Sequence, residues 1–167
     1  AYVYDIEHPK RYSPRDAMYY LIARIARIYP LHFMTLLATL LFFMLMALIN
    51  WGLGGEDCCV FDESLRTAES LAANLFLIHA WGMFDWVTWN LPSWSLSAEL
   101  FCYLIFAALL TINGAKRKLV LVALSCMAVL FYCLCMAASS DVDEIFRLST
   151  VRAASAFTIG ILLFLGR

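Results

Sequence analysis

Charged residues are scarce in this chain. Asp, Glu, Lys and Arg together make up 15% of its 167 residues, whereas an ordinary soluble domain carries about a quarter. Hydrophobic residues make up 63%, and the mean hydropathy is +0.78. This balance excludes an ordinary soluble globular domain and predicts an all-α fold, a polytopic bundle of four to five transmembrane helices.

The chain also lacks an excess of positive charge and a paired cysteine motif. Its formal net charge is −1 and its basic residues fall in small clusters, so we expect no nucleic acid partner. None of the six cysteines forms a Cys-x-x-Cys pattern, and those within apolar segments are typical of small apolar residues. We therefore expect no metal site.

The apolar runs are long enough to cross a membrane. At about 1.5 Å per residue, the run from Ile28 to Trp51 exceeds a hydrocarbon core of about 30 Å. Ser13 is a good N-cap for the helix that leads into this run, and Asp16 lies in its first turn, where the helix dipole favours an acid. The sequence predicts one membrane domain over residues 1–167, with helices at 14–51, 68–86, 93–112, 119–138 and 151–166.

The segment 68–86 is the weakest of the five, and it leaves two topologies open. It contains Asn74 and His79, so it either crosses the membrane or dips into it and returns. If it crosses, the basic regions Lys10–Arg27 and Lys116–Lys118 fall on opposite faces, as a regular bundle favours. If it returns, both regions lie on the cytoplasmic side, as the positive-inside rule favours.

A polar stretch opens the third predicted helix. Residues 90–99 read Asn-Leu-Pro-Ser-Trp-Ser-Leu-Ser-Ala-Glu, and Ser93 is a good N-cap directly after the proline. Ser95, Glu99 and Tyr103 are spaced at four, so they share one helix face. A carboxylate within an apolar span is costly unless partners hold it. Glu99 therefore marks either a functional site or a satisfied packing contact.

Two arginines stand at the entry of the longest apolar run. Arg24 and Arg27 are three residues apart and share one face. Guanidinium groups make bidentate, charge-assisted hydrogen bonds to phosphate oxygens, so the pair suits a phosphate-bearing ligand. The alternative is that both side chains reach to lipid headgroups as anchors.

These motifs resemble those of the acyltransferase 3 family of integral-membrane O-acyltransferases. The family has an Arg-x-x-Arg followed by Ile-x-Pro, upstream of a Trp-Ser-Leu-Ser-x-Glu segment, and this chain has the same order at 24–30 and 94–99. Two further segments are similar to family motifs. One is the Asn-Leu-rich segment at 74–82, and the other is the Arg followed by Phe-x-x-Gly in the last predicted helix. Further residues on family motifs are Trp94, Tyr103, Arg152 and Gly160.

The resemblance implies transfer of an acyl group, usually acetyl from acetyl-CoA or another acyl-CoA, to a hydroxyl of a sugar or polysaccharide. The acyl-CoA is a co-substrate, and no permanently bound cofactor is expected. By the same resemblance, Arg24 and Arg27 bind the donor phosphates, and Glu99 with Ser95 and Ser97 orients the reacting groups. The implied partners are membrane lipid, acyl-CoA and a carbohydrate acceptor, in the bacterial inner membrane.

The chain departs from the family pattern at its start. The histidine that serves the family as catalytic base lies in a first helix with no counterpart upstream of Tyr19, and His8, His32 and His79 fall outside that motif. We therefore expect an internal segment of an acyltransferase that is inactive alone. Two alternatives remain, namely a transporter or flippase module in which Glu99 and the arginines line a path, and a catalytically inactive scaffold.

Overall fold

The computed structural model describes residues 12–53, 66–84, 89–90, 92–112, 114–138 and 149–165, and it is helical in these ranges without a strand. The predicted all-α fold is thus confirmed. Within these ranges, three helices are long and apolar enough to span a membrane, and Thr150–Phe164 is a shorter apolar one. His8 and Lys10 lie outside the described residues. The helices are α1 (Pro14–Gly52), α2 (Ala68–Leu75), α3 (Ser93–Leu110), α4 (Gly114–Ala138) and α6 (Ser149–Leu165).

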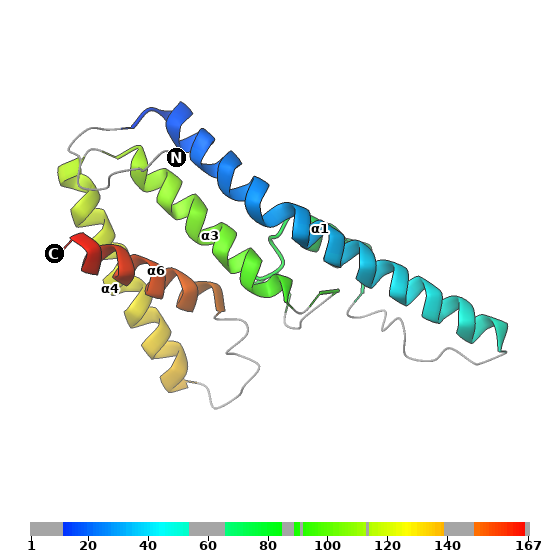
Figure 1. Cartoon of the computed structure of the whole chain (residues 1–167). Helices are drawn as coiled ribbons and strands as arrows, with labels where there is room; N and C mark the ends of the chain where they lie inside the picture. The colour runs from blue at the N-terminus through cyan, green and yellow to red at the C-terminus, as the bar shows by residue number, and fades with distance from the viewer. Residues whose placement is uncertain are drawn as a thin grey trace.

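Helix α1 begins where the sequence predicts. The Ser13 hydroxyl accepts a hydrogen bond from the Arg15 N–H at 3.3 Å, and an Asp16 carboxylate oxygen accepts one from the Ser13 N–H at 2.9 Å. These two bonds satisfy backbone donors that a helix start leaves open. The helix continues through Pro30 for 39 residues, or about 58 Å. It therefore extends far beyond α3 (Figure 1).

Helices α1 and α3 lie side by side and antiparallel (Figure 1). Near the start of α1, the Tyr12 N–H donates to the Leu110 carbonyl oxygen at 3.1 Å. Before the start of α3, the Asn90 side-chain amide donates to the Thr35 hydroxyl at 2.9 Å. The apolar core around this contact contains Ala17, Tyr20, Ile28, Leu77, Leu100, Tyr103, Ala107 and Leu110.

Helices α4 and α6 pack against each other, and α6 also packs on α3. Helix α4 begins at Gly114, so the predicted start at 119 is wrong and Lys116–Lys118 lie within the helix. Arg117 is buried and donates through Nη2 to the Ile112 carbonyl oxygen at 3.0 Å. A cation at this place complements the carboxyl end of α3.

The weak segment 68–86 does not form one helix. Helix α2 has eight residues, about 12 Å, which is too short to cross a hydrocarbon core of about 30 Å. It ends in a Schellman motif, because the Ile78 N–H bonds to the Ala73 carbonyl and the Leu77 N–H to the Asn74 carbonyl. Leu77 is left-handed at φ 56°, a position usually taken by glycine. Residues 76–84, here named the turn segment, follow.

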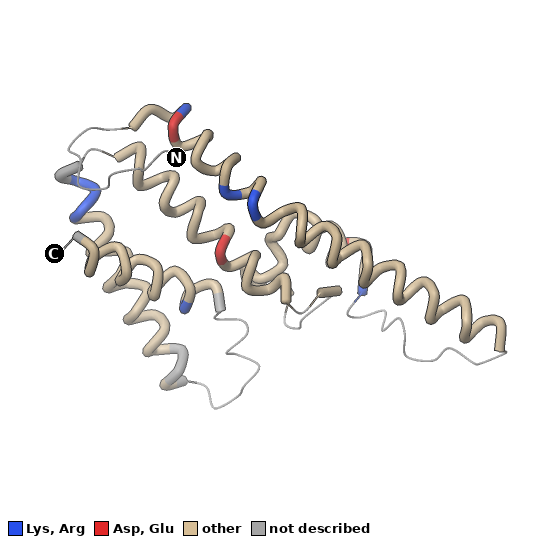
Figure 2. Tube along the Cα trace, viewed as in Figure 1, with Lys and Arg blue, Asp and Glu red and all other residues tan. Residues whose placement is uncertain are grey.

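The two basic regions lie at the same end of the bundle. The Arg117 guanidinium carbon is 5.8 Å from the ring centroid of Tyr12, so the start of α4 is next to the start of α1. Charges are few elsewhere on the described helices (Figure 2). This arrangement agrees with the topology in which segment 68–86 returns.

Leu110→Ala tests the contact between α1 and α3. Leu110 is fully buried, whereas Leu104 on the same helix is 38% exposed. Because lipid is as apolar as leucine, the loss comes from packing and the cavity left behind, and we expect about 2 kcal/mol less free energy of unfolding. Leu104→Ala is the control, with a loss under about 0.5 kcal/mol. Unfolding of both variants in mixed micelles measures the difference, and equal losses would contradict the assigned contact.

Candidate functional site

The polar residues of α3 divide between two sides of the helix. Residues two apart differ by about 200° around a helix axis, and residues four apart share a face. Ser93 and Ser97 therefore lie on one side, and Ser95, Glu99 and Tyr103 on another. The structure therefore does not bring Ser97 together with Glu99, although the sequence analysis grouped them.

The side that carries Glu99 meets the arginine motif of α1. The Tyr103 hydroxyl donates a hydrogen bond to Oε1 of Glu99, as their spacing predicts. Across the helix contact, the Arg24 guanidinium carbon lies 5.4 Å from the Tyr103 ring centroid and 5.3 Å from that of Tyr20. The two motifs that were separate in the sequence are thus brought together, and Figure 2 shows the single acid of α3 opposite two basic residues of α1.

This site holds charge of both signs without an ion pair. Arg24 and Glu99 are both partly exposed, and Arg27 is exposed one turn further along α1. Within the described ranges, no ion pair joins Arg24 to Glu99. Arg24 therefore contacts aromatic rings, Glu99 is held by a phenol, and both charges remain available to a ligand.

On the other side of α3, Ser97 holds the turn segment. Its hydroxyl donates to the Leu77 carbonyl oxygen at 2.7 Å and accepts from the Ala80 N–H at 3.2 Å. The indole N–H of Trp81 donates to the Ser97 carbonyl oxygen at 3.2 Å. The Thr150 hydroxyl of α6 donates to the Ala80 carbonyl oxygen. Ser97 thus satisfies backbone groups that the broken helix leaves open.

Ser93 has a similar structural place, and its predicted role as N-cap is wrong. The N-cap of α3 is Pro92, without a side-chain capping bond. The Ser93 hydroxyl donates instead to the Asn90 carbonyl oxygen at 2.6 Å, and it lies 3.1 Å from Nε2 of His79 and 3.3 Å from Oδ1 of Asn74. Ser93 is buried. Its hydroxyl contacts residues that precede α3 in the chain and does not cap the backbone N–H groups at the start of the helix.

A buried polar network links these residues to α1 and α2. Nε2 of His32 lies 2.8 Å from the Asn74 carbonyl oxygen, so this nitrogen carries the proton. The Asn74 side-chain amide donates to the Ser70 carbonyl oxygen at 2.9 Å, and the Trp89 indole donates to the Ser70 hydroxyl at 3.0 Å. Sequence reasoning missed this network, although isolated polar residues inside apolar runs were its visible sign.

His79 belongs to the network rather than to an open site. It lies in the turn segment, outside the spanning helices, and is 1% exposed. Desolvation by burial lowers the pKa of His79 to about 4, so the imidazole is neutral near pH 7. Its Nδ1 has no hydrogen-bond partner within the described ranges, and the Trp94 ring lies 5.7 Å from its own. His79 is therefore a buried member of the network within the described residues.

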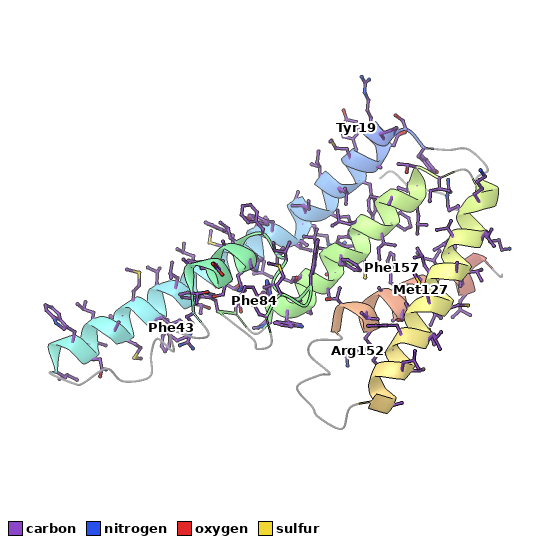
Figure 3. All side chains as sticks on the ribbon, turned by 180° about the vertical axis from the view of Figure 1, so that it is seen from behind. Tyr19, Phe43, Phe84, Met127, Arg152 and Phe157 are labelled. Atoms are coloured by element: carbon purple, nitrogen blue, oxygen red, sulfur yellow. The ribbon has the colours of Figure 1, made fainter. Side chains whose placement is uncertain are left out.

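The remaining motif residues lie elsewhere. Ser95 is exposed and donates to the Pro92 carbonyl oxygen at 3.0 Å, one turn before Glu99. Arg152 is exposed on α6, and Figure 3 places it away from the part of α1 that carries Tyr19. Gly160 is exposed, and a Cβ added there would meet nothing within 4 Å. The structure therefore brings Arg24, Glu99 and Tyr103 together, but neither Arg152 nor Gly160 with them.

Ser97→Ala separates support of the turn segment from chemistry. Without the hydroxyl, a buried carbonyl and a buried N–H lose their partner, and we expect about 1–3 kcal/mol less free energy of unfolding. Ser95→Ala, which removes an exposed local bond, is the matched control, with a loss under about 0.5 kcal/mol. Equal stability of the two variants in mixed micelles would refute the support assigned to Ser97.

Comparison with known proteins bears on the family of this chain. The model of the acyltransferase 3 family, described as an acyltransferase domain, matches residues 2–166. The match includes both motifs of the α1–α3 contact and confirms the resemblance found in the sequence. A search of curated proteins and a search of solved structures gave no match. Because the family model covers nearly the whole chain, the chain belongs to the acyltransferase 3 family.

Proposed function

We propose that the protein is a membrane-bound O-acyltransferase that transfers an acyl group, acetyl from acetyl-CoA, to a hydroxyl of a sugar or polysaccharide. The observation that carries this proposal is the meeting of Arg24 with the Glu99–Tyr103 pair between α1 and α3. The contact between α1 and α3 then holds a cation that suits the anionic acyl donor. It also holds a carboxylate that suits the hydroxyl group of the acyl acceptor.

The arginines suit the donor. Acyl-CoA carries phosphates, and a guanidinium offers two parallel N–H donors to phosphate oxygens. Arg24 is held by aromatic rings and Arg27 is exposed, so neither is committed to a carboxylate within the described ranges. We assign Arg24 and Arg27 to the phosphates of the donor, which supplies the activated thioester when bound.

Glu99 suits the acceptor. In the reaction, the hydroxyl oxygen bonds to the acyl carbon and the carbon–sulfur bond of the thioester breaks. The hydroxyl proton passes to a base and then to the leaving sulfur, so CoA leaves as the thiol. This transfer needs a group that orients and accepts that proton. Tyr103 holds Oε1 of Glu99, and Oε2 accepts no hydrogen bond within the described ranges. We assign Oε2 to the orientation of the hydroxyl or of a basic group beside it, with Ser95 one turn away.

The proposed setting is the bacterial inner membrane, with lipid around the bundle and the arginine end on the cytoplasmic side. Large apolar side chains cover the exposed faces of α1 and α4, as contact with lipid requires. The competing proposal is a transporter or flippase, in which the same charges line a path. That protein would move its substrate without dependence on acyl-CoA, and the experiments below distinguish the two.

Glu99→Gln tests the acceptor side. The amide keeps the size of the side chain but loses the negative charge, so we expect kcat to fall at least about 100-fold while KM for acyl-CoA stays within about twofold. Release of free CoA thiol and mass of the acylated sugar, in the complete protein in nanodiscs, give the rate. Glu69→Gln, which changes an exposed acid of α2, is the matched control. Full activity of Glu99→Gln would defeat the role of Glu99.

Arg24→Ala and Arg27→Ala test the donor side. Each removes charge-assisted hydrogen bonds to phosphate, and we expect KM for acyl-CoA to rise about tenfold in either variant. Arg15→Ala changes an exposed arginine of the same helix and should leave KM unchanged. Direct titration of acyl-CoA into the protein in nanodiscs checks the affinity. An unchanged affinity in both variants, together with intact substrate transport, would favour the transporter.

A further inference from the structure

Arg24 lies against two aromatic rings from two helices. Its guanidinium carbon is 5.3 Å from the ring centroid of Tyr20 on α1 and 5.4 Å from that of Tyr103 on α3. Both distances lie within the roughly 6 Å limit of a cation–π contact. Tyr20 and Arg24 are four apart on α1, as Glu99 and Tyr103 are on α3, so two helix-face pairs meet across the contact.

The Tyr20 ring is itself fixed. Tyr20 is 6% exposed, its ring meets that of Tyr103 edge to face at 6.1 Å and 88°, and the Phe106 ring lies 4.9 Å away on α3. A ring with two packed aromatic neighbours has little rotational freedom left. The guanidinium that rests on it is therefore placed before any ligand arrives, which lowers the entropic cost of binding.

The adjacent tyrosine offers a contrast within the same helix turn. Tyr19 is 67% exposed and points away from the other helices (Figure 3). The two residues have the same chemistry and the same neighbourhood in sequence. Only the face of α1 on which they lie distinguishes them, so Tyr19 is a natural control for Tyr20.

We propose that Tyr20 is a positioning residue that holds the Arg24 guanidinium in place for the phosphate groups of the acyl donor, an inference that rests on the function proposed above. Tyr20 acts through Arg24 and does not touch the donor. An aromatic face stabilises the cation without a carboxylate that would compete for its N–H groups, so these stay available to phosphate oxygens.

The test varies the electron density of the ring at position 20 while its shape stays nearly constant. The complete protein in nanodiscs carries phenylalanine at this position, and then phenylalanine with one, two and three ring fluorines. Each fluorine weakens the cation–π contact, so KM for acetyl-CoA should rise stepwise, by about fivefold overall, while kcat stays within about twofold. Phenylalanine is the reference of the series, so the Tyr20 hydroxyl contributes to none of its members. A flat series would overturn the proposal.

Two controls separate this inference from the function on which it rests. The same fluorine series at position 19 should leave KM unchanged, because Tyr19 is exposed. In an Arg24→Ala background, the series at position 20 should also be flat, at an already raised KM. If Arg24→Ala raises KM but the position 20 series is flat in the parent protein, only the role of Tyr20 is overturned. If Arg24→Ala leaves KM unchanged, the donor site itself is refuted.

Discussion

The structure depends on one constraint of the lipid environment, that each backbone N–H and carbonyl must find a partner inside the protein. Helices meet this demand by themselves, but the chain leaves the helix after Leu75. The Ser97 hydroxyl then serves the Leu77 carbonyl and the Ala80 N–H, and Thr150 of α6 serves the Ala80 carbonyl. Without these side chains, the Leu77 and Ala80 backbone groups would be buried against α3 without hydrogen-bond partners.

Helix α3 therefore performs two tasks with one short motif. The serines at 93 and 97 attach buried backbone and histidine groups, and Glu99 with Tyr103 meets the arginine of α1. A period of about 3.6 residues per turn makes this division possible, since positions two apart lie on opposite sides. A motif that reads as one polar stretch in the sequence is divided in the fold between a side that holds the turn segment and a side that faces Arg24.

Much of this could be predicted from the sequence, where local physics decides. Ser13 and Asp16 define the start of α1 because their bonds are made within one turn, and the spacing of Glu99 and Tyr103 is enough to predict their hydrogen bond. The end of α2 could not be predicted, because Leu77 takes a left-handed position in which glycine would be expected. The role of Ser93 was equally hidden, since its partners are distant in the chain.

The contact of Arg24 with Tyr103 could be predicted from the sequence only in part. The sequence indicated that both motifs carry chemistry, but the distance between them depends on the antiparallel contact of α1 with α3, which no local pattern encodes. The family resemblance supplied the order of the motifs and not their geometry. The contact of Arg24 with the Tyr103 ring needed the fold, whereas the four-residue spacing of Tyr20 and Arg24 already places these two residues on one face of the helix.

A helix is a stiff rod, and this gives the two-sided α3 a mechanical consequence. Ser97 attaches the turn segment to one side of the rod and Glu99 stands on the other, so a rotation of α3 about its axis would move both at once. Any event that pulls on residues 76–84 would also turn the carboxylate relative to Arg24. The support of the broken helix and the geometry of the charged site are therefore carried by opposite sides of a single element.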